Sequence, residues 1–155
     1  MAETKLWKVL TLRQPWAWMV VFGGKRIENR VWNTHLRGEF LIHAGLGMTL
    51  QEYNNAMDFA FGVFMDERTF YLPDSETPFG QCQTPFPAFN DLQRGGIIGK
   101  ATLVDVLPRL PMGNRGWNHD WRMEGQYGYV LKDVQALPFQ KCSGARKFWE
   151  YDYAA

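Results

Sequence analysis

The chain has 155 residues, of which 46% are hydrophobic, enough for one domain with a single core. Its 17 basic side chains nearly cancel its 16 acidic ones, which excludes the global positive field that dominates non-specific binding to duplex DNA. Cys82 and Cys142 lack the paired spacing of a zinc site or a disulfide framework, so we expect free thiols in a reducing compartment. No apolar stretch approaches the roughly 20 residues that span a bilayer, and we expect a soluble, cytoplasmic protein without membrane contact.

The first part of the chain predicts a strand, a helix and two further strands. Residues 6–12 are rich in strand formers, and Pro15 suits the first turn of a helix over residues 16–22, which two glycines then end. Apolar and polar residues alternate over 27–32, the period of a half-buried strand, and again over 39–44. We expect these two strands to pair as a hairpin.

A helix and a long loop are expected next. Thr49 and Glu52 have the spacing of a capping box, which predicts a helix start. The helix carries an apolar stripe that we expect to face the core, formed by Tyr53, Met57, Ala60, Phe61 and Phe64. Residues 73–90 are dense in Pro, Gly, Ser, Thr and Gln with interspersed Phe, which favours a long ordered loop.

The second part of the chain predicts strands over 97–107 and 127–131, with a short last strand near 147–150. Together with two helices, these strands predict an α+β fold that is predominantly β. A small mixed β-barrel with flanking helices fits them better than a sandwich or a doubly wound sheet. No linker or repeat divides the chain, so we expect a single domain over residues 1–155.

Residues 23–30 concentrate cations and a carboxylate at a helix-to-strand turn, where glycines let a ligand approach the backbone closely. Strand alternation places Glu28, Arg30 and Trp32 on one face. Lys25 enters at the turn, so the four side chains are predicted to converge on one cavity. A solvated strand face with ordinary ion pairs is the alternative interpretation of the same pattern.

The side chains of this segment suit recognition of a nucleotide. Arg30 offers a planar fork to a phosphate or a base edge, and Trp32 a stacking platform. Glu28 can accept hydrogen bonds from an exocyclic amine. If the chain catalyses a reaction, we expect Lys25, made less basic by burial or by neighbouring arginines, to work with Glu28 on an amide or a phosphodiester.

Other polar and aromatic groups give weaker signals. His43 ends a strand before two glycines, which suits the rim of a site, although a lone histidine among apolar residues is more often structural. Residues 117–124 suit a loop that closes over a ligand, or a surface loop pinned by two buried indoles. Tyr127 and Tyr129 point to the same side of their strand, so one can reach the cavity while the other packs.

Several chemistries are disfavoured by missing motifs. Three histidines without a paired histidine or cysteine companion disfavour a metal site, and we expect no metal. The chain has no nucleophile elbow, no phosphate-binding loop and no dinucleotide fingerprint, and we expect no cofactor.

Several motifs follow one another in a fixed order. Residues 10–17 read Leu-Thr-Leu-Arg-Gln-Pro-Trp-Ala, and residues 24–30 are followed by Trp32, Thr34 and the pair Arg37-Gly38. With the later segments Ile42-His43-Ala44, Gly95 to Gly99, Val104 to Val106 and Tyr127 to Asp133, they resemble the ASCH domain family of the PUA-like superfamily. The resemblance covers almost the whole chain. It is close to prokaryotic and phage members and to the ASCH domain of a eukaryotic transcription coactivator.

The resemblance implies a PUA-like barrel with a cleft that binds RNA, another single-stranded nucleic acid or a modified nucleoside. Our leading hypothesis is a module that takes a nucleobase into this cleft. We take Lys25 and Glu28 as candidate catalytic residues. The candidate nucleic-acid contacts are Gln14, Trp16, Arg30, Trp32, Arg37, His43, Trp121 and Tyr127.

The resemblance also implies a second hypothesis, a metal-independent hydrolase. One type of relative removes the acetyl group from N4-acetylcytidine with a lysine, a threonine and a glutamate, and another is a ribonuclease. Lys25 falls on the lysine, Glu28 stands at the threonine position, and the glutamate falls near Glu124. Residues 46–94 form a longer insertion than many members carry. Its helix and aromatic loop motivate a third hypothesis, a protein-interaction domain.

Overall fold

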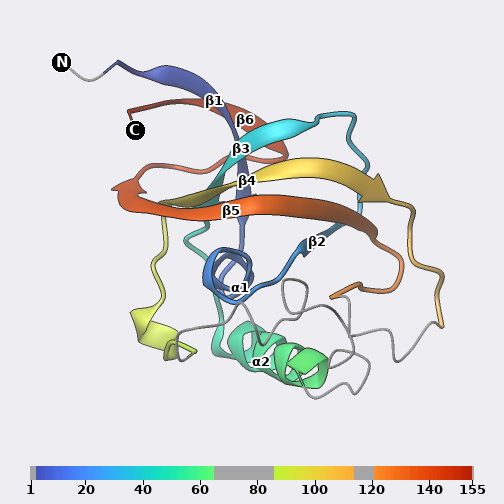
Figure 1. Cartoon of the computed structure of the whole chain (residues 1–155). Helices are drawn as coiled ribbons and strands as arrows, with labels where there is room; N and C mark the ends of the chain where they lie inside the picture. The colour runs from blue at the N-terminus through green and yellow to red at the C-terminus, as the bar shows by residue number, and fades with distance from the viewer. Residues whose placement is uncertain (1–2, 65–85, 114–120, 155) are drawn as a thin grey trace.

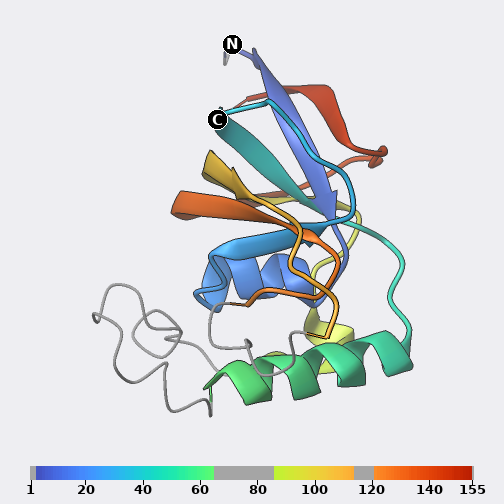
Figure 2. The same ribbon diagram turned by 90° about the vertical axis from the view of Figure 1, so that its right-hand side faces the viewer.

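The computed structural model describes residues 3–64, 86–113 and 121–154. Within these residues, six strands form one sheet in the order β2-β5-β4-β3-β1-β6, and α1 lies between this sheet and α2 (Figures 1 and 2). The strands are β1 (Lys5–Leu12), β2 (Ile27–Arg30), β3 (Gly38–Ala44), β4 (Gly96–Leu107), β5 (Tyr127–Lys141) and β6 (Phe148–Tyr153). The helices are α1 (Trp16–Phe22), α2 (Leu50–Phe64) and the short 3-10 helix η3 (Phe89–Asp91).

The sheet is mixed and curved like a barrel. β1 runs parallel to β3, and every other neighbouring pair is antiparallel. No ladder joins the edge strands β2 and β6 in the described residues, and side chains bridge them instead. The rings of Trp32, just after β2, and Phe148 of β6 meet edge to face at 5.8 Å. The predicted α+β, predominantly β fold is confirmed.

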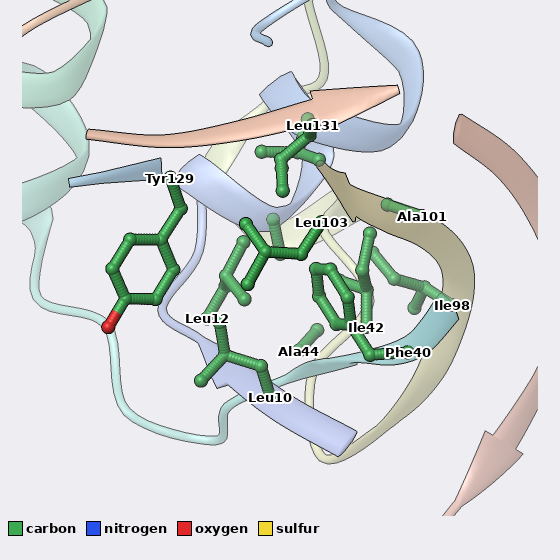
Figure 3. Packing of buried hydrophobic residues seen from close by; sticks show 12 residues of the cluster. Leu10, Leu12, Phe40, Ile42, Ala44, Ile98, Ala101, Leu103, Tyr129 and Leu131 are labelled. Carbon is green, nitrogen blue, oxygen red and sulfur yellow. The ribbon is translucent and has the colours of Figure 1, made fainter. Parts of the chain in front are cut away.

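The main core lies on the concave face of the sheet, under α1 (Figure 3). Because alternate residues of a strand point to the same face, β1 contributes Leu10 and Leu12, and β3 contributes Phe40 and Ile42. Ala17 and Val20 of α1 pack on this core and cover it. The packing fixes α1 against the end of β1, and this junction carries the site described below.

The expected hairpin between the second and third strands is wrong. β2 pairs with β5, with Ile27 opposite Val130 and Arg30 opposite Tyr127, whereas β3 pairs with β1 and β4. Hairpin strands are usually joined by two to five residues. The longer segment 31–37 instead carries the chain across the open side of the sheet.

Helix α2 begins with the expected capping box. The Glu52 amide donates to Thr49 Oγ1 at 3.1 Å, and the Thr49 amide donates to Glu52 Oε2 at 3.0 Å. The predicted apolar stripe is partly wrong, because Phe61 is 65% exposed. The buried face carries mostly small residues, Ala56, Ala60 and Val63, which allow α2 to pack closely on the aromatic cluster beneath α1.

The later strands are confirmed, and one is longer than expected. β5 continues to Lys141 beyond the predicted end at Leu131, and its register with β4 shifts at three places. Most of the predicted loop over 73–90 lies outside the described residues. No described helix has the length and apolar character needed to cross a membrane. That the whole chain is one domain stays a prediction.

Candidate functional site

A cavity of about 250 Å³ opens where the end of β1, the start of α1 and strand β2 come together. Its walls come from three separate segments of the chain, residues 11–16, 25–30 and 123–126. The lining residues are Thr11, Arg13, Trp16, Lys25, Glu28, Asn29, Arg30, Met123 and Gln126. We call this cavity the cleft.

Two glycines place Lys25 under the cleft. The amides of Gly23 and Lys25 both donate to the carbonyl of Met19, which ends α1. A Cβ atom on Gly23 would lie 2.9 Å from that carbonyl oxygen, so glycine is needed there. Gly24 adopts a φ of 75°, a conformation that glycine reaches without strain, and the chain turns from α1 directly into β2.

Buried charges form the floor of the cleft. The Lys25 side chain is only 1% exposed, and its Nζ donates to the carbonyl of Ile27 and lies 3.2 Å from Glu28 Oε2. The other carboxylate oxygen of Glu28, Oε1, lies 3.3 Å from Arg30 Nε. One carboxylate is therefore held between two cations, and strand alternation explains why Glu28 and Arg30 share a side of β2.

Burial lowers the pKa of Lys25 below its ordinary value of 10.5. The negative charge of Glu28 opposes this shift, and the positive charge of Arg30 adds to it. The burial effect is the largest of these, so the Lys25 ammonium loses its proton more easily than that of an exposed lysine.

Arg30 connects strand β2 with the end of β1 at the cleft. Its Nη2 donates to the carbonyl of Thr11, at the end of β1, at 2.6 Å. Its Nε is buried and makes no hydrogen bond within the described residues, although Glu28 lies close by. The Nε is therefore held by its charge pair with Glu28, while the Arg30 side chain, 22% exposed, still lines the cleft.

Trp16 forms an aromatic wall of the cleft. Its ring packs edge to face on Phe59 of α2 at 5.6 Å, and Lys25 Nζ lies 5.4 Å from the ring centroid. Because Phe59 belongs to the insertion, the inserted helix supports this wall.

Several predicted contacts lie away from the cleft and hold the structure together. Gln14 is buried, where its Nε2 donates to the Gln93 carbonyl and its Oε1 accepts from the Trp18 amide. Trp121 is buried against α2, and its carbonyl accepts a hydrogen bond from Asn29 Nδ2 at 2.8 Å. It therefore positions a lining residue without itself lining the cleft.

The aromatic residues predicted beside Arg30 also pack elsewhere. Strand β2 ends at Arg30, so the alternation that placed Trp32 beside Glu28 does not continue, and Trp32 packs on the barrel core. Tyr127 packs on the same core, with the Arg109 guanidinium 5.0 Å above its ring. Tyr129 is fully buried and donates its hydroxyl to the Trp32 carbonyl.

His43 is buried and connects neighbouring segments through hydrogen bonds of its ring. Its Nε2 lies 2.8 Å from the carbonyl of Cys142, which can only accept, so Nε2 carries the proton. Its Nδ1 then accepts from the hydroxyl of Thr11, 3.2 Å away, and that hydroxyl accepts from Trp149 Nε1. This network connects β1, β3 and the C-terminal segment, and it explains the position of His43 without a ligand.

The remaining predicted positions lie outside the cleft as well. Arg37 is exposed and donates to the carbonyls of Thr34 and Leu36 in its own loop. Glu124 accepts from the Gly113 amide and does not line the cleft. Residues 117–120, the first half of the predicted closing loop, lie outside the described residues.

Five lining residues were not among the sequence candidates, namely Thr11, Arg13, Asn29, Met123 and Gln126. Arg13 had a usable signal, because it is a cation at the point where a strand turns into a helix that begins with an aromatic residue. Met123 lies in the segment 117–124 that was predicted to close over a ligand, whereas Gln126 had no signal, because it reaches the cleft through long-range pairing of β5 with β2.

In the described ranges, no three or more His, Cys, Asp and Glu side chains gather in a way that would hold a metal ion. The absence of a metal from the function stays a prediction.

The fold and the site define a small barrel-like α+β domain with a polar, aromatic-walled cleft between β1, α1 and β2. The model of the ASCH domain matches residues 10–141, most of the chain, and the protein belongs to this family. The PUA-like barrel that the motifs predicted is thereby supported, and the family is generally associated with RNA binding.

A curated relative gives a weaker likeness. The chain is 26% identical over 145 residues to Activating signal cointegrator 1 of Mus musculus. This match covers 92% of the chain but only 22% of the mouse protein, so the chain spans about a fifth of that relative's length.

Proposed function

We propose that this domain binds RNA or another single-stranded nucleic acid and takes one base into the cleft. The observation that carries the proposal is the arrangement of an aromatic wall, Trp16, beside a floor of hydrogen-bonding charges, Glu28 and Arg30. The family association with RNA binding supports it.

The size of the cleft favours a single base or nucleoside. Its volume of about 250 Å³ lies just below the roughly 300–1,000 Å³ that is usual for drug-sized ligands. A longer strand would therefore leave its other nucleotides at the rim. Sequence-specific proteins commonly recognise single-stranded RNA through such unstacked bases.

The chemistry of the cleft matches a base edge. The ring of Trp16 offers a stacking surface, which every base can use. Glu28 offers carboxylate oxygens that accept from an exocyclic amine, and the Arg30 guanidinium, whose side chain is 22% exposed, offers N–H donors to a ring nitrogen or a carbonyl oxygen. A base edge with an adjacent donor and acceptor would satisfy both groups.

The local charge also favours a nucleotide, although the chain is nearly neutral. The described lining includes three basic residues, Arg13, Lys25 and Arg30, against one acidic residue, Glu28. Binding through this cleft therefore needs no positive field over the whole protein.

The test is the affinity of the protein for short single-stranded RNAs. Base stacking on an aromatic side chain contributes about 1–3 kcal/mol, so Trp16→Ala should weaken binding by roughly 5- to 150-fold. Trp7→Ala is the matched control, because Trp7 is half-buried on β1 and packs in a different cluster. Equal weakening in the two variants, or none in either, would contradict the proposal.

A second candidate is a hydrolase acting on RNA phosphodiesters or on N4-acylcytidine. The observation that favours it is Lys25, whose pKa burial lowers and whose Nζ lies beside Glu28 at the cleft. A less basic lysine suits proton abstraction from water near neutral pH. Of the three positions that the amidohydrolase relatives imply, Lys25 and Glu28 line the cleft and Glu124 does not.

Mass spectrometry of RNA and acylated cytidine after incubation with the protein tests this candidate. Lys25→Met should abolish turnover, and Lys100→Met, which removes a lysine paired with Glu39 on the sheet, should leave it intact. Turnover that survives Lys25→Met would contradict a hydrolase of this type. The protein-interaction alternative and the cytoplasmic location stay predictions.

A further inference from the structure

Arg13 stands at the rim of the cleft and is held by the inserted helix. It follows β1 directly, and its Nη2 donates to both carboxylate oxygens of Glu52 on α2, at 2.9 and 2.7 Å. The Arg13 and Glu52 side chains are 56% and 43% exposed. Neither residue was a sequence candidate for the site, and both belong to the described part of the chain.

The surroundings of this ion pair keep it in one place. Glu52 also closes the capping box of α2 through the Thr49 amide, so its carboxylate is fixed at the start of the helix. Gly47 lies against the guanidinium, and a Cβ atom there would approach Arg13 Nη1 to 3.1 Å. The hydrogen bond from Arg13 lowers the pKa of Glu52, which stays ionised near neutral pH.

We propose that Arg13 binds the phosphate adjacent to the base in the cleft, and that Glu52 of the inserted helix competes with this phosphate for the guanidinium. The inference rests on the proposed function and deepens it. It makes Arg13 and Glu52 the residues that set how strongly the cleft distinguishes a nucleotide from a nucleoside.

Arg13 is the lining cation best placed for this role. Lys25 is buried and held by Glu28 and a backbone carbonyl, and Arg30 is held by Glu28 and the Thr11 carbonyl. Arg13 is half exposed, and Glu52 is bound through its Nη2, whereas its planar fork can offer two parallel N–H groups to a phosphate. An exposed ion pair is weak, so a phosphate can replace Glu52 at little cost.

The competition predicts that Glu52 weakens the binding of nucleotides but not of nucleosides, which affinity measurements can test. A nucleoside enters the cleft without disturbing Arg13 and Glu52, whereas a nucleotide must displace the Glu52 carboxylate. Glu52 therefore reduces the preference for phosphorylated ligands. The measured quantity is the ratio of the affinity for a nucleoside monophosphate to the affinity for its nucleoside.

The experiment is calorimetric titration with the four ribonucleosides and their 3′- and 5′-monophosphates. Glu52→Gln removes the competing charge, and it keeps the cap, because glutamine serves as well as glutamate at this position of a capping box. We expect this variant to raise the ratio about two- to fivefold, the scale of an exposed ion pair. Arg13→Gln should lower the ratio toward one.

Glu39→Gln is the matched control. Glu39 is also an exposed glutamate in an ion pair, with Lys100 at 3.3 Å, and it lies on β3 away from the cleft lining. The ratio of nucleotide affinity to nucleoside affinity in Glu39→Gln should equal that of the parent. A general electrostatic effect of removing one negative charge would raise the ratio in Glu39→Gln as much as in Glu52→Gln, which would overturn the inference.

The outcomes separate the inference from the proposed function. If nucleosides bind in a manner that depends on Trp16, and neither Glu52→Gln nor Arg13→Gln changes the ratio, the inference is overturned and the proposed function stands. If the parent binds neither nucleosides nor nucleotides nor short RNAs, both are overturned. A higher ratio in Glu52→Gln with a lower ratio in Arg13→Gln supports the inference.

Discussion

Replacing Glu28 by glutamine removes the carboxylate that lies 3.2 Å from Lys25 Nζ and 3.3 Å from Arg30 Nε. At an effective dielectric constant of 20, each of these charge pairs is worth about 5 kcal/mol before desolvation. Desolvation of each buried ion costs several kcal/mol and cancels much of this gain. We therefore expect Glu28→Gln to lower the free energy of unfolding by about 3–5 kcal/mol, as is typical when a buried pair loses one partner.

Urea unfolding at pH 7 measures this loss. A second variant, Lys25→Met with Glu28→Gln, removes the buried ammonium together with its partner and should recover a large part of the lost stability, since no unpaired lysine remains. The double variant also keeps the test decisive if Glu28→Gln alone fails to fold. A loss below about 1 kcal/mol in Glu28→Gln, or a double variant no more stable than the single one, would refute the reasoning.

Two further predictions concern pH and close packing. Because the pKa of Lys25 is lowered by burial, the unfolded chain binds more protons between that lowered pKa and 10.5, so the parent should gain stability relative to Lys25→Met as the pH rises through this window. Burial raises the pKa of Tyr129 and Cys142, so these two groups lower the stability as the pH rises, but they do so equally in the parent and in Lys25→Met. Parallel curves of stability against pH for the two proteins would contradict the prediction. Gly144→Ala would place a Cβ atom 2.7 Å from His43 Cε1 and should cost about 1–3 kcal/mol in urea unfolding. In the control, Gly45→Ala, the nearest atom would be 3.4 Å away, and an equal loss there would argue against close packing as the cause.

Local signals in the sequence predicted the helices and strands well. Pro15 and the two glycines bounded α1, and the spacing of Thr49 and Glu52 located the start of α2. These features act over a few residues, where propensity and capping dominate. The family motifs supplied the barrel itself, because they carry information on long-range pairing that no local pattern contains.

Long-range arrangement explains what the sequence did not reveal. The alternation of polar and apolar residues in β2 was correct, but it could not show that β2 pairs with β5 and not with β3. It also could not show that the strand ends at Arg30, which turns Trp32 into the core. In α2 the predicted stripe correctly included Ala60, but it also included Phe61, which is exposed, and omitted Ala56, which is buried.

The sequence indicated the floor of the candidate site and one wall, Trp16, and missed the other lining residues. Lys25, Glu28 and Arg30 lie within six consecutive residues, so a single segment revealed them. A fully buried lysine is rare, so its burial could not be expected from the sequence. Arg13 and Met123 come from separate segments, and only the folded chain brings them to the cleft.

The central claim is that a single base enters the cleft beside Trp16. Titration of the isotopically labelled protein with a short single-stranded RNA, followed by NMR, tests it most directly. We predict that the largest shifts affect the Trp16 indole and the amides of residues 24–30, which form the wall and floor of the cleft. Shifts confined to the opposite edge of the sheet, around Trp7 and β6, would contradict the claim.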